Sequence, residues 1–364
     1  MKQRGSAGKR IAAIVAIAAV VILLMTPSVQ SVLEDIITSP FKPRYPEEAS
    51  FTLKRTLTVD AGGGTVKSFN IDMPEPMNIV ENGNRMQTIN SVEYSVDVAH
   101  TIRYGHNWTV WSDDVPFSGR RTIAVTYDVT ARTVLWDIDA TTSGNISDIP
   151  EALKEQYLRD EWKMTPDHPD VGSLSREIVG GERNVYLVLQ SIYGWMRDNV
   201  KYPIFSSSGS PQTALETMES RVGDCDDQSI LFCSLARAAG VPAWLQLGAL
   251  YVGIEDNWGG HAWLQACVPL KSGGYENVVI DPVNGEFLVW RPNRFVEFTD
   301  DGNATHLVDY YYIYNASIVS GTNSVLYDSY EALSYEESER KVSQGSVFVL
   351  GVRPPGMCLV PLRT

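Results

Sequence analysis

Alternating hydrophobic and polar residues run through the part of the chain between residues 49 and 142. Stretches such as SFTLKRTLTVD and TIAVTYDVTARTVLWDID place an apolar side chain at nearly every second position, which is the period of a half-buried β-strand. Turn-forming residues at Gly62–Gly64 and Asn82–Asn84 separate such strands. Several short strands with no helical stretch between them are typical of a β-sandwich, so we predict one over residues 49–142.

After residue 148 the apolar spacing changes to three and four positions, which is the spacing of one face of a helix. This pattern predicts helices at residues 150–158, 182–200 and 210–221. Pro211 suits the first turn of the last helix, where a missing N–H leaves no hydrogen bond unmade. We expect the apolar stripes of these helices to form a core.

Two apolar runs follow and predict strands at residues 261–268 and 276–282. The sequence Lys-Ser-Gly-Gly between them favours a tight turn, so we expect an antiparallel hairpin. Beyond residue 300 we predict further strands at residues 306–314 and 346–350, on either side of an acidic helix near residues 329–341.

The stretch GDCDDQSILFCSLARAAGVPAW predicts a helix with clear ends. Asp224 is placed to cap its start, with Asp227 three residues on, and Gly240 followed by Pro242 is a stop signal. Cys225 therefore falls in the first turn. Free backbone N–H groups and the positive end of the helix dipole favour a thiolate there, and the same N–H groups form half of an oxyanion site.

A thiolate nucleophile also needs a proton acceptor and a group that orients this acceptor. Of the five histidines, His261 is the one in an apolar strand, and Asp281 ends the next strand of the predicted hairpin. We therefore predict that Cys225, His261 and Asp281 form one thiol site. Tyr202 and Trp195 are the candidates for a second oxyanion donor.

The aspartates around Cys225 would raise the pKa of its thiol if they pointed at it. We expect Asp224 and Asp227 to bond the backbone instead. Cys233, two turns further along the helix, and Cys267, in a strand, are interpreted as core residues. With four cysteines in the whole chain, no disulfide scaffold is indicated, and a Cys225–Cys233 disulfide is excluded by the rise of one helix.

Metal binding is the other interpretation of these residues. A zinc site built from Cys225, His261 and Asp281 has no evident fourth ligand nearby. The aspartates at residues 224–227 and 300–301 lack the spacing of a calcium loop. We predict no metal and no cofactor.

Three segments, GDCDDQSILFCSLARAAGVPAW, GGHAW and VVIDP, resemble the signature segments of the transglutaminase-like superfamily, a papain-like thiol fold. The resemblance is close over residues 200–285. It implies that Cys225 is the nucleophile, His261 the general base and acid, and Asp281 the orienting carboxylate. Where this family commonly has arginine after Gly-Val-Pro-Ala, the chain has Trp244, so we expect altered local packing or substrate preference there.

The first residues, MKQRGSAGKR, are basic and precede fifteen apolar ones. This pattern is typical of a secretion signal or a signal anchor. With residues 26–29 the apolar run approaches the roughly 20 residues that cross a bilayer, and the basic end is expected to stay in the cytoplasm. We predict an uncleaved single-pass transmembrane helix, as archaeal and bacterial members of the family often have, with the main body extracellular. The motif Asn-X-Ser/Thr occurs outside this segment at Asn107, Asn145, Asn303 and Asn315.

Acidic residues outnumber basic ones, for a net charge of −14. Without the four basic residues among the first ten, the remaining chain has 26 basic and 44 acidic residues. Such a surface repels phosphate backbones, which argues against nucleic acid as a partner.

The predicted fold is therefore α+β: a papain-like transglutaminase core after an N-terminal β-sandwich and a transmembrane helix. In chain order the predicted parts are a cytoplasmic stub (1–10), the anchor (11–28), a linker (29–48), the β-sandwich (49–142), the catalytic domain (148–300), and C-terminal strands and a helix packing on the core (301–364).

The predicted function is that of a thiol enzyme, which forms a thioester with a protein or peptide amide outside the cell. Hydrolysis would make it a peptidase or amidase, and transfer to an amine would make it a transglutaminase. The alternative is a non-catalytic envelope protein that binds or supports partners and keeps a relic thiol domain. Oligomeric state is not indicated by the sequence.

Overall fold

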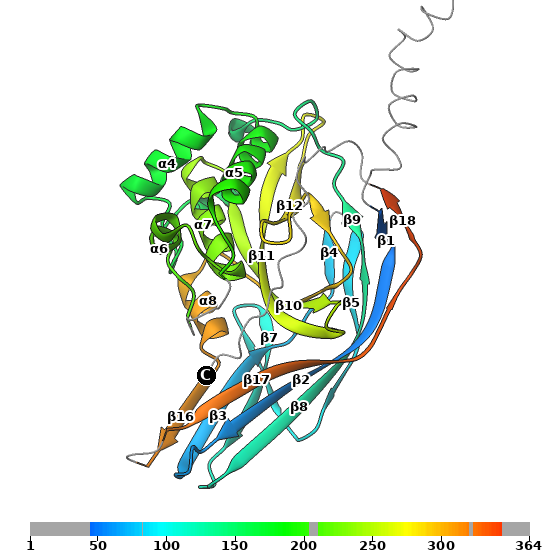
Figure 1. Ribbon diagram of the computed structural model, residues 1–364, viewed down its shortest axis with the longest axis vertical. Coiled ribbons are helices and arrows are strands. Elements are labelled where there is room, and N and C mark those ends of the chain that lie inside the picture. The colour runs from blue at the N-terminus through cyan, green and yellow to red at the C-terminus, as the bar shows by residue number, and fades with distance from the viewer. Residues whose placement is uncertain (1–43, 82, 204–209, 320–322, 344–364) are drawn as a thin grey trace, which may run out of the picture. The chain divides into compact units, whose positions relative to one another are not determined.

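Three larger β-sheets and a layer of helices build the described part of the chain (Figure 1). The computed structural model describes residues 44–81, 83–203, 210–319 and 323–343. The predicted stub, anchor and most of the linker lie outside these residues, as does the predicted strand at 346–350. No helix within the described ranges is long and apolar enough to span a membrane.

Two of the sheets face each other as the predicted sandwich. One has the strand order β17-β2-β8-β5-β4, and the other has the order β16-β3-β7-β6. The strands of the first half of the chain are β2 Glu48–Asp60, β3 Val66–Pro74, β4 Ile79–Glu81, β5 Asn84–Tyr94, β6 Ala99–Arg103, β7 His106–Asp113, β8 Arg120–Arg132 and β9 Val134–Leu135.

Alternation along β2 and β8 creates the interior of the sandwich. The two strands pair antiparallel along their whole length, and buried residues of β2 such as Leu53 and Leu57 alternate with partly exposed ones. Phe69 of β3 and Trp111 of β7 pack into the same buried cluster from the facing sheet. The period-two pattern of the sequence is thus the pattern of one face turned inward.

The C-terminal region completes this sandwich and corrects two predictions. The predicted strand at 306–314 is mostly a helix, α8 (Ala304–Tyr311), followed by β16 (Tyr314–Ile318), and the predicted acidic helix near 329–341 is a strand, β17 (Val325–Glu337). β16 pairs with β3, and β17 pairs with β2, so each adds an edge strand to one sandwich sheet and neither joins the sheet of the thiol core.

Local packing explains both corrections. In α8, Leu307 and Tyr311 lie four residues apart and are both buried, which is helical spacing, and the side chain of Asn303 caps the start by accepting from Thr305 N–H at 3.0 Å. In β17 partly buried residues such as Leu326 and Tyr330 alternate with exposed ones such as Glu331. Asp328 lies on the partly buried side and pairs with Arg55, and the strand satisfies its backbone by pairing with β2.

The third large sheet carries the candidate site and has the order β13-β12-β11-β10-β15. β11 and β12 form the predicted antiparallel hairpin, with Leu264 opposite Ile280. The strands of this part of the chain are β10 Ala243–Val252, β11 Asn257–Pro269, β12 Tyr275–Asp281, β13 Glu286–Phe287, β14 Val289–Trp290 and β15 Arg294–Thr299. β14 pairs with β9, and β1 (Arg44–Pro46) pairs with β18 (Arg340–Ser343).

Helices cover one face of this sheet. They are α3 Glu151–Tyr157, α4 Pro169–Val179, α5 Val185–Asn199, α6 Ala214–Ser220 and α7 Cys225–Ala238. The three predicted helices correspond to α3, α5 and α6, whereas α4 was not predicted. α6 starts at Ala214 after the cap Thr213, so Pro211 precedes the helix and does not lie in its first turn as predicted.

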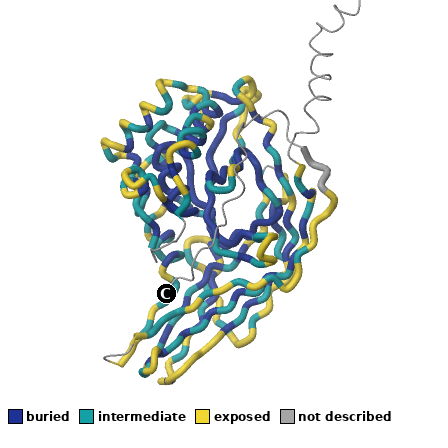
Figure 2. Tube along the Cα trace, in the orientation of Figure 1, coloured by how far each residue is buried: buried dark blue, intermediate teal, exposed yellow. Residues whose placement is uncertain are grey.

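α7 is the most enclosed of these helices, because every residue from Cys225 to Arg237 is buried (Figure 2). Its end is the predicted one: Gly240 has φ +91°, and the N–H of Val241 donates to the carbonyl of Ala236 at 2.9 Å. This Schellman-type closure satisfies carbonyls that burial would otherwise leave without donors. A helix buried on all sides holds its first residue in a fixed place.

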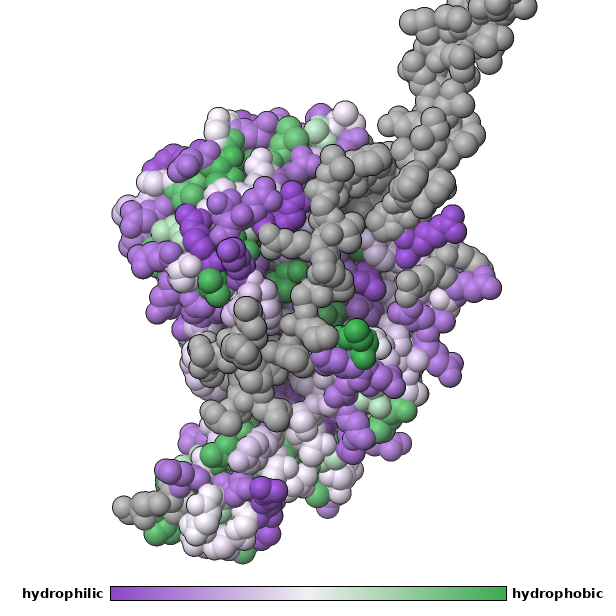
Figure 3. All heavy atoms as spheres, in the orientation of Figure 1, coloured by the Kyte–Doolittle hydropathy of each residue, from purple (hydrophilic) through white to green (hydrophobic). Residues whose placement is uncertain are grey.

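Side chains of the sandwich hold the edge strand β15 of the core sheet, within the unit Pro46–Arg340. Gln87 of β5 accepts from the N–H of Val296 at 2.8 Å and donates to its carbonyl at 2.9 Å. One amide side chain thus makes the two backbone hydrogen bonds that a neighbouring strand would otherwise make. Arg55 of β2 also donates to Glu297 of β15 at 3.1 Å. The visible face of the molecule is mostly hydrophilic, with apolar side chains scattered over it (Figure 3).

Gly248 of β10 provides a test of how β15 is seated. It lies opposite His261 in β11 and opposite Val296 in β15, and a β-carbon there would come within 1.9 Å of the carbonyl oxygen of Phe295. We expect Gly248→Ala to lower the free energy of unfolding by about 3 kcal/mol, because two strands must separate to admit the methyl group.

Urea unfolding measures this loss. Gly253→Ala is the matched control, since its nearest neighbouring atom, in Tyr251, lies 3.8 Å away. Equal stability of the two variants would contradict the close approach of β10 and β15.

Candidate active site

The start of α7 is fixed by the carboxylate of Asp227. This side chain accepts from the N–H of Asp224 at 3.0 Å and from the N–H of Gln212 at 2.6 Å, and the predicted capping box between Asp224 and Asp227 is present. Gly223 is needed just before it, because a β-carbon there would lie 2.7 Å from the β-carbon of Asp227. Cys225 follows as the first residue of the helix, as predicted.

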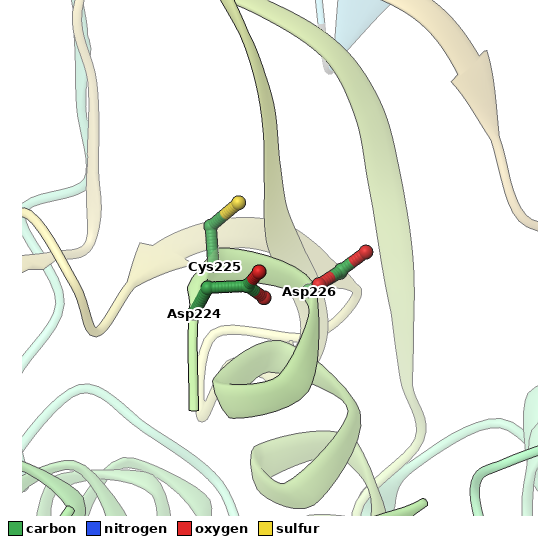
Figure 4. Close-up of side chains that lie close together, drawn as sticks. All are labelled: Asp224, Cys225 and Asp226. Atoms are coloured by element: carbon green, nitrogen blue, oxygen red, sulfur yellow. The ribbon is translucent and has the colours of Figure 1, made fainter. Parts of the chain in front are cut away.

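Two carboxyl groups flank the thiol at this helix start (Figure 4). Burial, followed by the hydrogen bond and the charge of Asp226, raises the pKa of Asp224 from 3.8 to about 11. At neutral pH Asp224 therefore keeps its proton and adds no negative charge beside the thiol. The repulsion that a carboxylate at this position would exert on a thiolate at Cys225 is therefore avoided.

His261 and Asp281 meet as the hairpin prediction requires. His261 lies on β11 and Asp281 at the end of β12, and Nε2 of the ring is 2.8 Å from Oδ2 of the carboxylate, with both side chains fully buried. Nε2 donates to the carboxylate, which leaves Nδ1 for the other side of the ring. The thiol of Cys225 hydrogen-bonds the ring, so the three predicted residues are brought together.

The charge of Asp281 controls the protonation of His261. Burial by itself lowers the pKa of the imidazole, but the charge and hydrogen bond of Asp281, followed by those of Cys225, raise it from 6.5 to about 10. At neutral pH the ring is therefore protonated. A protonated imidazole between a thiol sulfur and a carboxylate is the arrangement that stabilises a thiolate.

Asp281 is itself held by two residues that the sequence did not reveal. Asn284 donates its backbone N–H to Oδ1 at 3.0 Å and its side-chain NH₂ to Oδ2 at 2.8 Å, and Arg294 donates to Oδ2 at 2.6 Å. Burial raises the pKa of the carboxyl, but the charge and hydrogen bond of His261, then Arg294 and Asn284, hold it well below its usual range. The carboxylate is thus ionised and fixed in orientation.

Sequence signals for these two residues are weak. Asn284 lies three residues after Asp281 in a turn, a place where asparagine is common for local reasons. Arg294 opens the apolar strand RFVEFT, and a charged residue at the start of a strand ordinarily points to solvent. Its complete burial is visible in the tertiary structure alone.

The remaining predicted residues fall as follows. Trp195 on α5 packs under the guanidinium of Arg221, which lies 4.5 Å from its ring centroid, and Tyr202 is half-buried against the core. Their assignment as oxyanion donors stays a prediction. Trp244 is buried and stacks on Tyr157 with centroids 4.5 Å apart, which describes its local packing, and an effect on substrate preference stays a prediction.

The other two described cysteines are core residues, as predicted. Cys233 and Cys267 are free, fully buried thiols. Burial raises the pKa of Cys267 to about 12 and that of Cys233 well above its ordinary value. Neither provides a reactive thiolate at neutral pH.

The donor atoms do not favour the metal-binding interpretations. His261 and Asp281 bond each other directly and Arg294 places a cation on the carboxylate, so a zinc ion has no place between them. The ligand atoms of Asp224, Cys225 and Asp226 do lie within 4.8 Å of one another. That group offers three ligand atoms, one fewer than a structural zinc site uses.

Comparison with known proteins agrees with this geometry. Residues 172–282 match the model of the transglutaminase-like superfamily. A crystal structure from Cytophaga hutchinsonii, described as a "putative cysteine protease", superposes with a TM-score of 0.56 at 17% identity, over 82% of this chain and 94% of that one. No curated protein matches the chain in sequence.

A second solved structure has a lower score. The periplasmic domain of TgpA from Pseudomonas aeruginosa matches with a TM-score of 0.32 at 12% identity, over 68% of this chain and 91% of that one. The family match and the Cytophaga structure confirm the predicted transglutaminase-like, papain-like fold. Residues 172–282 thus correspond to the core of that superfamily.

Stability is expected to depend on pH through the buried pair. The raised pKa of His261 means that its protonated form contributes stability that is fully present below pH 6.5 and is lost as the pH rises to about 10. The lowered pKa of Asp281 acts in the other direction: its contribution is present above pH 3.8 and is lost as the pH falls.

We expect the free energy of unfolding to fall by on the order of 3 kcal/mol between neutral and strongly alkaline pH. His261→Gln removes most of this slope, which urea unfolding at closely spaced pH values measures. His100→Gln, at a side chain with 54% exposure, is the control and keeps the slope. An unchanged slope in His261→Gln would show that other groups cause it.

Proposed function

We propose that this protein is a thiol enzyme that cleaves or exchanges amide bonds through a thioester at Cys225. The observation that carries the proposal is the buried His261, held between the thiol of Cys225 and the ionised carboxylate of Asp281. In this proposal Cys225 is the nucleophile, His261 the general acid and base, and Asp281 the orienting carboxylate.

The proposed first step is acyl transfer to sulfur. The thiolate of Cys225 attacks the amide carbonyl carbon, the S–C bond forms, and the carbonyl oxygen becomes an oxyanion beside the N–H groups at the start of α7. When the C–N bond breaks, the protonated ring of His261 gives its proton to the leaving amine. The products are a thioester and a neutral imidazole.

The proposed second step returns the enzyme to its starting state. The neutral ring of His261 takes a proton from water or from an amine as that nucleophile attacks the thioester carbonyl, and the C–S bond breaks. The sulfur of Cys225 leaves as the thiolate beside the protonated ring. Water yields a carboxylic acid, and an amine yields a new amide.

We propose a protein or peptide of the cell envelope as substrate and water as the usual acceptor. The N-terminal segment MKQRGSAGKRIAAIVAIAAVVILLM supports an extracellular substrate, although it lies outside the described residues. The likeness to the Cytophaga hutchinsonii structure supports the fold of such an enzyme, and not its specificity. A non-catalytic envelope protein remains the alternative that the following experiments test.

Thiol reactivity tests the nucleophile directly. We expect iodoacetamide to label Cys225 of the full chain at least about tenfold faster than Cys233 and Cys267 below pH 7, because only Cys225 has a protonated imidazole beside it. His261→Ala weakens this labelling, and peptide mapping by mass spectrometry distinguishes the thiols.

Activity provides the second half of this test. Cys225→Ser lowers hydrolysis of a casein-derived peptide mixture by about a thousandfold or more, whereas Cys267→Ala is the matched control and retains it. A Cys225 that labels like an ordinary thiol, in a chain that cleaves nothing, would favour the non-catalytic alternative.

The usual acceptor is identified by measuring how much of the thioester reacts with water and how much reacts with an amine. We expect the full chain, given a glutamine-containing peptide and a fluorescent primary amine at millimolar concentration, to release more free acid or ammonia than labelled amide. Mass spectrometry of the peptide measures both products in one reaction. Predominant amine incorporation would identify a transglutaminase and overturn the assignment of water as the usual acceptor.

A further inference from the structure

A row of charged side chains with alternating sign continues from the proposed triad toward the surface. Each member contacts the next through a hydrogen bond or an ion pair. From the thiol outward, the row consists of Cys225, His261, Asp281, Arg294, Glu286 and Arg291.

The contacts beyond Asp281 are short. One guanidinium nitrogen of Arg294, Nη2, lies 2.6 Å from Asp281 Oδ2 and 2.6 Å from Glu286 Oε2. The other oxygen of Glu286 accepts from Arg291 at 3.1 Å. The side chain of Arg294 is fully buried and that of Arg291 is 31% exposed, so the row ends at solvent.

Strand pairing creates the need for the buried cation. Asp281 of β12 and Glu286 of β13 are direct partners in the antiparallel pair. Like charges opposite each other in a sheet repel, and burial strengthens that repulsion. The guanidinium of Arg294 binds both carboxylates and removes the conflict.

Arg294 is also linked to the imidazole of His261 through the indole of Trp263. The guanidinium lies 5.5 Å from the ring centroid of Trp263, and the same indole stacks on His261 with centroids 5.7 Å apart and an angle of 30°. Trp263 is itself fixed, because its Nε1 donates to Gln246 at 2.8 Å. The ring of His261 is thus held from its edge by Asp281 and from its face by Trp263.

We propose that Arg294 is a positioning residue of the thiol site, which fixes the carboxylate of Asp281 and sets how firmly His261 retains its proton. Asp281 favours the protonated ring, Arg294 opposes it, and Glu286 in turn offsets Arg294. This inference deepens the proposed function, because general acid catalysis needs an imidazole that holds a proton at rest and still releases it to the leaving amine.

Other charged groups near the ring come from the helix side. On α7 they are the thiol of Cys225 and the carboxyl groups next to it, those of Asp224 and Asp226. Asn284, at the end of the hairpin, is neutral and donates to Asp281. Among the residues just named, Arg294 is therefore the positive group that opposes protonation of His261.

The test is the pKa of His261, read by NMR from isotope-labelled histidine in the full chain, with His261→Gln to assign its signal. Glu286→Gln is expected to lower this pKa by about half a unit, and Arg291→Gln to raise it by about 0.3 unit because solvent screens its charge. Arg294→Met is expected to raise it by about one unit.

Arg294→Met leaves two facing carboxylates buried without a cation, so it can fail to fold. The double variant Arg294→Met with Glu286→Gln removes that conflict and still raises the pKa of His261, because Arg294 hydrogen-bonds the carboxylate that pairs with His261, whereas Glu286 contacts Arg294. Glu276→Gln, on the same strand as Asp281 but outside the row, is the matched control and leaves the pKa of His261 unchanged.

Opposite shifts for Glu286→Gln and the arginine variants would support the proposal. Shifts of one sign, or none in Glu286→Gln and the double variant, would overturn it. The pKa of His261 is measured independently of catalysis. If the pKa shifts have opposite signs as expected but Cys225 is unreactive, the proposed function is refuted and this inference is not. A reactive Cys225 with an insensitive His261 refutes only this inference.

Discussion

Removing the carboxylate of Asp281 from water is the constraint on which the site depends. An ionised carboxylate buried without partners is unfavourable by several kcal/mol or more, and this one has no exposed surface. Its partners come from β11, from the turn after β12 and from the start of β15. The five-stranded sheet must therefore be assembled, including an edge strand that is not adjacent to β12, before the carboxylate can be ionised there.

At the other end of the site, the negative charge to be stabilised is that of a thiolate at Cys225, and here a neighbouring carboxyl group is kept neutral. The sulfur lies at the first residue of a helix that is buried along its length, where backbone N–H groups favour negative charge. Two neighbouring carboxyl groups would cancel that benefit if both were ionised. Because burial lets Asp224 keep its proton, this carboxyl group adds no negative charge beside Cys225, and the protonated ring of His261 supplies a positive one.

The sandwich contributes to this site by holding the strand that carries Arg294. Gln87 pairs with the backbone of Val296, and Arg55 binds Glu297, so the open edge of the core sheet is closed by side chains from another sheet. The strands β16 and β17, which follow α8 in the chain, complete that sandwich. A change far from Cys225 in sequence can consequently alter the seating of its distant partners.

The local features of the site were determined by sequence alone: the ends of α7 and the hairpin of β11 and β12. The grouping of Cys225, His261 and Asp281 was predicted from these elements together with the resemblance to a family. Capping, turn and period signals act between residues a few positions apart, so neighbouring letters are sufficient to read them. The helix α8, the strand β17 and the buried cation Arg294 were decided by the tertiary structure. Whether a tyrosine-rich or acidic segment pairs as a strand, and whether an arginine is buried, depends on which distant surface it meets, and spacing along the chain does not encode that surface.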